Sequence, residues 1–208
     1  MLGVSYLKIN QLKKNKRGKD FFRQNADLVA KELLGDYLVL MRNKDTLIGV
    51  IVETEAYLGV DDDASHAFGG KITERNKIMY CDGGVIYVYL IYGKYFCFNI
   101  VVSKKGDPQS VFIRAVEPIL GIEIMKKNRG ISNLRNLTNG PCRWTQAFGI
   151  DKYFLGKSIC GNEIFISRDT HKEFSIGIAK RIGIEYASNS KNLPLRFYIK
   201  NNTFVSKN

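Results

Sequence analysis

The sequence predicts an α+β fold, a single domain with a curved antiparallel β-sheet, a protruding β-hairpin and surrounding helices. Several apolar runs of strand length, separated by short turns, indicate the antiparallel sheet. Fewer segments show the three-to-four-residue spacing of apolar side chains that indicates helices. The length of 208 residues is typical of one domain, and a hydrophobic content of 45% suits a buried core without disulfide or metal support.

The N-terminal part divides into a tail and the start of the domain. Residues 1–19 are predicted to be a basic, mobile arm, because their lysines and arginine precede any hydrophobic pattern. Residues 20–208 form the single domain. Helical spacing predicts a helix over 25–34, with Asn25 as its N-cap and Gly35 as its stop. Two strands, 37–41 and 46–57, follow it.

The middle of the chain contains a long loop and the clearest hairpin. Residues 58–83 are rich in glycine and acids and show no period, and loops of this length are often functional. The runs 84–91 and 95–102 are strongly strand-like and are joined by the short turn Tyr92-Gly93-Lys94. The hairpin is therefore predicted to protrude at Tyr92.

The rest of the chain completes the sheet and adds helices. We expect a strand at 110–116, a helix opened by Pro118 and ending near Asn128, a helix at 141–148, and late strands near 163–167, 176–182 and 194–200.

The charge points to a polyanionic partner. Lysine and arginine total 32 against 20 acids, a formal net charge of +12. Such an excess of positive charge favours nucleic acid as the binding partner, and an anionic membrane surface as the second choice. The alternative is that the protein merely has many solvated lysines and no such partner. The basic residues gather at 8–19, 71–77 and 126–129.

The cysteines and histidines do not suggest a metal centre. The four cysteines are not spaced as metal ligands, and the only histidines are His66 and His171. No cofactor is expected. The sequence shows neither a signal-peptide pattern nor an apolar run of membrane-spanning length, so we expect a non-secreted monomer without a membrane partner. Its location would be cytoplasmic and nucleoid-associated in a bacterium, or nuclear in a eukaryote.

The first candidate site is the run Glu53-Thr54-Glu55-Ala56-Tyr57. Alternate residues of a strand share one face, so Glu53, Glu55 and Tyr57 are predicted to point the same way. Such a face is often merely solvated. Here, however, the run leads into the loop that contains His66, so acids, an aromatic and a histidine converge at one end of the sheet.

The same acids could instead bind a divalent metal. Glu53, Glu55 and the acids at 61–63 could supply oxygen ligands. No second acidic cluster elsewhere completes such a shell, so we expect no metal.

The hairpin tip is the second candidate site. Burial is hard to arrange at a tight turn, so Tyr92 is predicted to be exposed, where it could act as a wedge in a nucleic-acid stack. Lys94 would then contact a phosphate. The alternative is that Tyr92 packs on a neighbouring loop.

The third candidate is Arg114, which lies within the apolar strand 110–116. An unpaired arginine is costly to bury, so Arg114 should pair with Glu55, Glu117 or a phosphate.

Taken together, these motifs resemble the alkyladenine (3-methyladenine) DNA glycosylase family. The matching segments are Val-Glu-Thr-Glu-Ala-Tyr-Leu-Gly, the acidic loop that ends at His66, Tyr-Val-Tyr-Leu-Ile-Tyr-Gly-Lys-Tyr-Phe-Cys-Phe-Asn and Arg-Ala-Val-Glu-Pro. The strongest similarity covers about residues 50–118, and a weaker one extends from the helix near residue 25 to Leu195-Arg196-Phe197-Tyr198.

The resemblance implies a monofunctional glycosylase that flips alkylated or deaminated purines, such as 3-methyladenine and hypoxanthine, out of duplex DNA. Glu55 would be the base that activates water. Arg114 would help to hold that water, together with backbone around Ile182, which also belongs to the base pocket.

The family pattern also implies roles for the aromatic residues. Tyr57, His66 and Tyr89 would stack the flipped base, Asn99 would reject the exocyclic amino group of guanine, and Tyr92 would fill the gap in the duplex. Two departures stand out: Lys94 replaces an apolar tip residue of the mammalian members, and the segment 184–186 matches poorly.

Two other functions fit the same residues. A non-catalytic nucleic-acid-binding module would use the aromatics and the charge alone, and a metal-dependent nuclease would use the acidic cluster.

Overall fold

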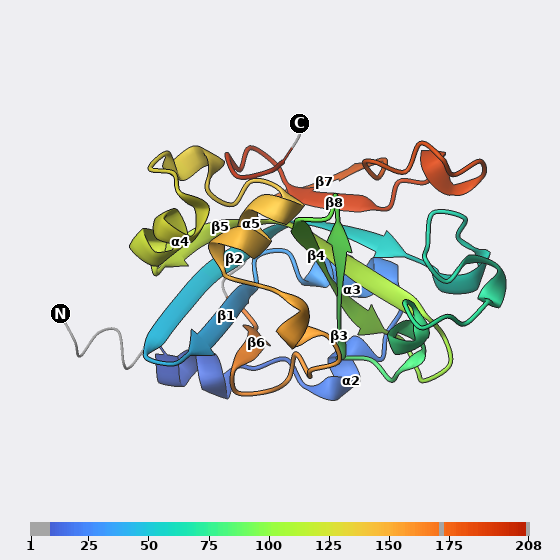
Figure 1. The fold of residues 1–208 in the computed structure, drawn as a ribbon, viewed down its shortest axis with the longest axis horizontal. Helices are drawn as coiled ribbons and strands as arrows, with labels where there is room; N and C mark the ends of the chain where they lie inside the picture. Colours follow the sequence, from blue (N-terminus) through green and yellow to red (C-terminus); the bar gives the residue numbers. More distant parts are fainter. Residues whose placement is uncertain (1–8, 171–172, 207–208) are drawn as a thin grey trace.

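The computed structural model describes residues 9–170 and 173–206, which form an eight-stranded antiparallel sheet flanked by helices (Figure 1). The strands are β1 (Tyr37–Arg42), β2 (Asp45–Tyr57), β3 (Ile86–Ile91), β4 (Tyr95–Val102), β5 (Gln109–Leu120), β6 (Ile164–Ser167), β7 (Ile176–Ala179) and β8 (Arg196–Ile199). The α-helices with defined bounds are α2 (Lys19–Phe22), α3 (Ala26–Glu32), α4 (Ile122–Arg129) and α5 (Pro141–Ala147). The predicted α+β architecture is confirmed.

The long strand β2 organises the sheet. The strand order is β3-β4-β5-β2-β1-β6, and β8 pairs with both β2 and β7. One edge of β2 pairs with β1 from Asp45 to Val50 and with β8 from Glu53 to Glu55. The other edge pairs with β5 along nearly its whole length. The sheet therefore divides into two branches in the middle of β2, next to Glu53.

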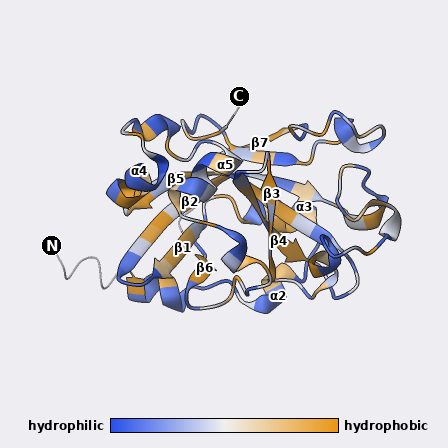
Figure 2. Ribbon diagram, in the orientation of Figure 1, coloured by the Kyte–Doolittle hydropathy of each residue, from blue (hydrophilic) through white to orange (hydrophobic). Residues whose placement is uncertain are grey.

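The main core lies on one face of this sheet. Thr54 of β2 donates a hydrogen bond to the Ala30 carbonyl of α3 (2.8 Å), and the Trp144 indole of α5 donates to the Ile113 carbonyl of β5 (2.9 Å). Thr54 and Ile113 are register partners, so α3 and α5 cover the same face. Figure 2 shows that the strands are largely hydrophobic and the connecting loops mostly hydrophilic.

On the opposite face of the sheet, side chains from four strands lie in one row. Glu55 of β2 pairs with Phe112 of β5, Phe112 with Asn99 of β4, and Asn99 with Tyr87 of β3. Residues in one row of a sheet point to the same side. Strand register therefore brings residues from four distant parts of the sequence onto one surface.

The predicted basic arm is wrong from residue 9 onward. Residues 9–14 are helical, and Leu12 packs against the small cluster Val39, Ile48 and Phe165. Lys16 pairs with Ser167 through a β-bridge, and Arg17 binds the buried Asp36 at 2.8 Å. Leu12, an apolar residue within the basic run, therefore attaches this segment to the domain. Residues 1–8 of the predicted arm lie outside the described residues.

The predicted helix start at Pro118 is also wrong. Pro118 belongs to β5 and pairs with Gly49, beside a register shift between Ile48 and Gly49. Such an irregularity in the ladder tolerates a residue without an N–H group. The helix starts only at Ile122. Gly121 precedes it with a φ of 81°, in the left-handed region that glycine adopts without strain.

The predicted strand 176–182 ends early, at Ala179. The following residues leave the sheet and bring Ile182 to Glu55, as described below. Within the described residues, we find no helix with the length and apolarity needed to cross a membrane.

Candidate active site

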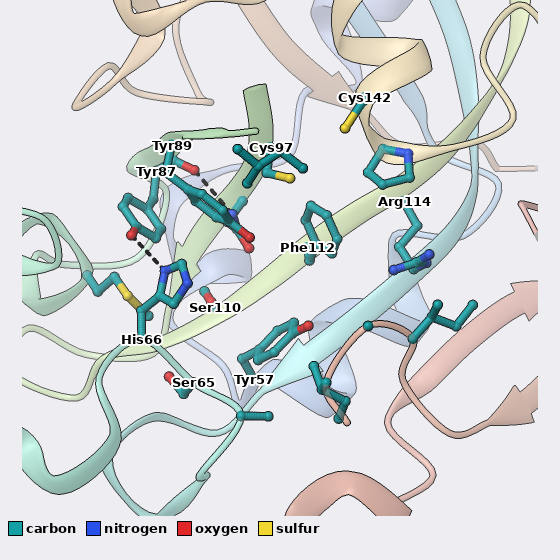
Figure 3. A pocket seen from close by; sticks show the side chains of 18 of the residues that line it. Tyr57, Ser65, His66, Tyr87, Tyr89, Cys97, Ser110, Phe112, Arg114 and Cys142 are labelled. Carbon is teal, nitrogen blue, oxygen red and sulfur yellow. Dashed lines mark hydrogen bonds between the residues drawn. The ribbon is translucent and has the colours of Figure 1, made fainter. Parts of the chain in front are cut away.

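A cavity of about 440 Å³ opens on the face of the sheet opposite the main core. Two loops and one helix end complete its walls: the residues after β2, the residues after β7 and the start of α5. Figure 3 shows Tyr57 facing His66, Tyr87 and Tyr89 across this cavity, with Phe112 and Ser110 between them. The cavity is therefore walled by rings on two sides.

Glu55 lies at one end of the cavity, behind the residues that line it. Its side chain has no exposed surface. One carboxylate oxygen accepts the Ile182 N–H at 2.8 Å and lies 3.1 Å from the Arg114 guanidinium, and the other accepts the Tyr57 hydroxyl at 3.0 Å. Ile182, Arg114 and Tyr57 all line the cavity, so the carboxylate contacts its wall from three directions. A carboxylate has about four acceptor positions, and these contacts use three of them.

The environment of Glu55 favours a basic carboxylate. Burial raises the pKa of Glu55 above its ordinary value, and the Arg114 charge, the Ile182 N–H and the Tyr57 hydroxyl oppose this rise. The net shift is upward. A carboxylate whose pKa is raised towards the working pH suits a general base.

Arg114 is paired, as its buried position requires. Its partners are Glu55 and Glu53, and only 6% of the residue is exposed. Burial alone would lower the pKa of Arg114, but Glu55 and Glu53 raise it overall. Of the predicted partners, Glu55 is confirmed, whereas Glu117 instead accepts a hydrogen bond from Asn202.

The ring wall opposite Tyr57 is held by hydrogen bonding and edge contacts. His66 and Tyr89 meet edge to face, with ring centroids 4.6 Å apart. The His66 Nδ1 lies 2.9 Å from the Tyr87 hydroxyl. Burial, followed by the positive charge of Arg75, lowers the pKa of His66 to about 4. His66 is therefore neutral near pH 7, so one of its ring nitrogens carries a proton and the other accepts.

Tyr57 is supported from behind by an ion pair. The guanidinium of Arg181 lies 4.6 Å from the Tyr57 ring centroid and binds both oxygens of Asp62. It also donates to the Ala56 carbonyl at 3.0 Å. Although burial would raise the pKa of Asp62, the hydrogen bonds from Arg181 and from backbone N–H groups lower it.

Asn99 lies at the floor of the cavity, in the row between Phe112 and Tyr87. It is 4% exposed, and its amide donates to the Tyr87 carbonyl at 3.3 Å. Asn99 therefore lies against the cavity, whereas its implied role against guanine remains a prediction.

The hairpin tip presents the most exposed large apolar side chain of the described chain. Tyr92 is 89% exposed. Its φ of 51° lies in the left-handed region, and Gly93 follows with a φ of 64°. The Lys94 N–H donates to the Ile91 carbonyl at 3.1 Å, which closes the turn. Lys94 is also exposed. The alternative in which Tyr92 packs on a neighbouring loop is wrong.

The acids that could have formed a metal site are dispersed. Glu53 binds Arg114 and Arg196, Asp62 binds Arg181, and Asp63 accepts hydrogen bonds from the N–H groups of residues 188–190. Over residues 9–170 and 173–206, no three acids, histidines or cysteines are grouped to hold a metal ion.

Several residues of the site were not identified from the sequence. Tyr87 packs in a small hydrophobic cluster with Ala67 and Met79 and also binds His66. Asp62 was considered only among the possible metal ligands, and the side chain of Arg181 was not considered. Cys97 and Cys142 line the cavity, as does Tyr186, whose hydroxyl donates to the Ala64 carbonyl at 2.9 Å. The alternation of Tyr87 with Tyr89 on one strand was the available signal for Tyr87.

The cavity has aromatic walls and a buried, arginine-paired carboxylate at one end. Such a site suits an enzyme that binds a planar ring and hydrolyses the bond that attaches it. Together with the family match that follows, this places the protein in the class of N-glycosyl-bond hydrolases. The sequence profile of a family described as methylpurine-DNA glycosylase matches residues 20–203. The chain therefore belongs to the methylpurine-DNA glycosylase family.

Bacterial relatives agree with this assignment. A protein of Clostridium perfringens strain 13 is 48% identical over 201 residues, covering 91% of this chain and 98% of its own. A protein of Desulfitobacterium hafniense strain Y51 is 41% identical over 197 residues, covering 91% and 97%. One of Borreliella burgdorferi strain ZS7 is 45% identical over 189 residues, covering 90% and 97%. All three are provisionally named 3-methyladenine DNA glycosylases. The resemblance noted in the sequence is confirmed.

Proposed function

We propose that this protein removes alkylated or deaminated purines, 3-methyladenine and hypoxanthine among them, from duplex DNA by base flipping and Glu55-assisted hydrolysis. The observation that carries the proposal is the row across β2, β5, β4 and β3, which sets the Glu55 carboxylate at one end of a ring-walled cavity. The names of the bacterial relatives support 3-methyladenine as a substrate.

The proposed reaction begins with extrusion of the nucleotide. Unstacking a base costs a few kcal/mol, and least when the base is damaged. Tyr92 would enter the gap that the base leaves. Within the cavity the base would lie between Tyr57 and the rings of His66 and Tyr89, where each stacking contact returns about 1–3 kcal/mol. Alkylated purines are cationic, and the electron-rich faces of these rings favour a cation.

Hydrolysis would then use one water molecule held by Glu55. The carboxylate accepts a proton from this water, and the oxygen of the water bonds to C1′ of the sugar. The bond from C1′ to the glycosidic nitrogen breaks, and its electron pair leaves with the base. A cationic 3-methyladenine is thereby neutralised, whereas hypoxanthine leaves as an anion and then takes up the proton that Glu55 received from the water. The products are the free base and an abasic site. The carboxylate also stabilises the oxocarbenium character of the transition state.

Arg114 and Asn99 would assist at opposite sides of the nucleotide. Arg114 orients the Glu55 carboxylate and, with backbone near Ile182, the water. Asn99, at the floor, would exclude the exocyclic amino group of guanine. His66 is neutral near pH 7 and its Nδ1 is hydrogen-bonded to Tyr87, so Nε2 would face the edge of the base, as donor or acceptor according to the tautomer.

The experiment is a product analysis. Purified protein is incubated with methylated duplex DNA, with hypoxanthine-containing duplex and with undamaged duplex, in buffer with and without a chelator. The proposal predicts free 3-methyladenine and free hypoxanthine, abasic sites in intact strands, and no effect of the chelator. Binding without release of any base would instead indicate a binding module. Strand breaks abolished by the chelator would indicate a metal-dependent nuclease.

A further inference from the structure

A second carboxylate, Glu53, lies buried on the far side of Arg114 from the cavity. Glu53 has no exposed surface. One of its oxygens accepts the Arg114 Nε–H at 3.2 Å and an Arg196 N–H at 2.8 Å. The other oxygen accepts the Ser206 N–H at 2.7 Å. Glu53 therefore joins β2 to β5, to β8 and to the segment that follows β8.

The sheet is irregular at this point. The β2–β5 register shifts between Ile51 and Glu53 and again between Glu53 and Thr54, so Arg114 stands opposite no regular partner. Irregularities of this kind re-aim side chains. Here Arg114 uses its Nε toward Glu53 and a terminal nitrogen toward Glu55, 3.1 Å away. One guanidinium thus bridges two carboxylates that lie two residues apart on one strand.

The segment after β8 completes the enclosure. Besides the Ser206 N–H bond to Glu53, the Ser206 hydroxyl lies 3.4 Å from an Arg114 nitrogen. Phe204 belongs to the main core, and Asn202 is tied to Glu117 of β5. Residues 202–206 therefore shield the Glu53–Arg114 contact from water, and electrostatic interactions strengthen when water is excluded.

The charges in this cluster balance. Two carboxylates, Glu53 and Glu55, face two guanidiniums, Arg114 and Arg196, while Arg181 is paired separately with Asp62. Without the charge of Glu53, the two arginines would leave an excess positive charge beside the sugar, where positive charge also develops in the proposed transition state. The negative charge of Glu53 raises the pKa of Glu55, which makes Glu55 a stronger base.

We propose that Glu53 is a positioning residue, which fixes the Arg114 guanidinium against Glu55 and cancels the excess positive charge beside the reacting sugar. This inference rests on the proposed function, in which Glu55 is the base. Glu53 itself contacts neither water nor substrate in this scheme and acts through Arg114 and Glu55.

The test compares Glu53→Gln with wild type and with Glu163→Gln, the same change at a salt-bridged carboxylate that neither lines the cavity nor contacts residues 202–206. Single-turnover rates of base release are measured against pH, with duplex affinity measured in parallel. We expect Glu53→Gln to lower the rate constant by roughly 10²-fold, the scale of a small misplacement in an active site, with affinity nearly unchanged. We also expect the acidic limb of its rate profile to move to lower pH, because Glu55 becomes a weaker base.

A second readout does not depend on turnover. The Glu55 side-chain carboxyl carbon is titrated by NMR in the free, folded protein, with Tyr57, Glu53, Arg114, Arg181 and Arg196 as the charged or titratable groups that face it. In Glu53→Gln its midpoint should fall. If wild type releases no base, the proposed function fails, while this titration still tests the inference.

A second variant, which leaves the buried charges unchanged, tests the inference if Glu53→Gln does not fold. Ser206→Pro removes the N–H that binds Glu53 but leaves every charge of the cluster in place, and Ser206→Ala is its control. Ser206→Pro should slow base release more than Ser206→Ala does. The inference is overturned if the folded Glu53→Gln protein keeps its rate within about twofold, or if its Glu55 midpoint is unmoved or rises. It is equally overturned, where only the Ser206 variants fold, by equal rates in the two.

Discussion

The buried end of the site and the exposed hairpin tip differ in how tightly the protein holds their side chains. Glu55 has no exposed surface and three partners within 3.1 Å, whereas Tyr92 is 89% exposed at the end of a two-stranded projection. A general base must be held in one geometry before the substrate arrives, so packing and hydrogen bonds surround it. The proposed wedge, Tyr92, must meet a partner outside the molecule, and its exposure allows this. Substitutions at the two places should therefore separate chemistry from docking.

After loss of Glu55 itself, the largest effect is expected at Arg114. Arg114→Gln leaves Glu53 and Glu55 without their shared cation, so base release should fall by roughly 10²–10³-fold, as when a preorganised electrostatic partner is removed. Breaking a buried ion pair should also lower the free energy of unfolding by about 3–5 kcal/mol. Denaturant unfolding and single-turnover kinetics measure the two effects. A stable, active Arg114→Gln protein would contradict the assigned role.

Tyr92 should show the opposite combination. Tyr92→Gly removes the wedge, so affinity for lesion duplex should weaken by about 1–3 kcal/mol, the value of one aromatic stacking contact. Stability should not fall, because glycine accepts the positive φ that tyrosine adopts with strain. Fluorescence titration and thermal melting test both halves. A loss of stability, with affinity retained, would show that Tyr92 serves the fold.

The hydroxyl of Tyr57 should affect the pH dependence of the reaction. Its hydrogen bond lowers the pKa of Glu55, so Tyr57→Phe should raise that pKa further. Because the base must be ionised, the acidic limb of the rate profile should move to higher pH, opposite to the shift expected for Glu53→Gln. The rate at neutral pH should fall by roughly tenfold, near the value of one hydrogen bond to a charged group. An unmoved limb would argue against Glu55 as the titrating base.

Lys94 should give the smallest effect. If Lys94 contacts one phosphate, as its exposed place at the hairpin tip predicts, Lys94→Ala should lower the slope of log affinity against log salt concentration by about 0.9. Rates at saturating enzyme should not change. Equal salt slopes for Lys94→Ala and wild type would remove Lys94 from the docking face.

The same contrast explains how much the sequence could predict. Glu55 and Tyr57 on one strand face, and Tyr92 at an exposed tip, follow from local periodicity and from a short turn. The row from Glu55 to Tyr87 depends on the register of three strand pairs, which no local pattern specifies. The Asp62–Arg181 pair joins residues 119 positions apart, and the Glu53–Ser206 contact joins residues 153 apart.

The errors have local physical causes. The arm was predicted from the charge of residues 8–19, although Leu12 provides an apolar contact that anchors part of that run. Pro118 was interpreted as a helix start because proline favours that position, but a register shift beside Gly49 accommodates it within β5. Charge and single-residue preferences were outweighed by tertiary packing in both cases.

The role of Glu55 is tested most directly by separating binding from hydrolysis in one side chain. Glu55→Gln keeps the shape of the residue but removes its ability to accept a proton, and Glu163→Gln, at a paired carboxylate away from the cavity, serves as the control. We predict that Glu55→Gln binds duplex DNA containing hypoxanthine as tightly as wild type does and releases no free base in single-turnover assays, whereas Glu163→Gln binds this DNA and releases the base. Base release by Glu55→Gln at a rate near that of wild type would contradict the account.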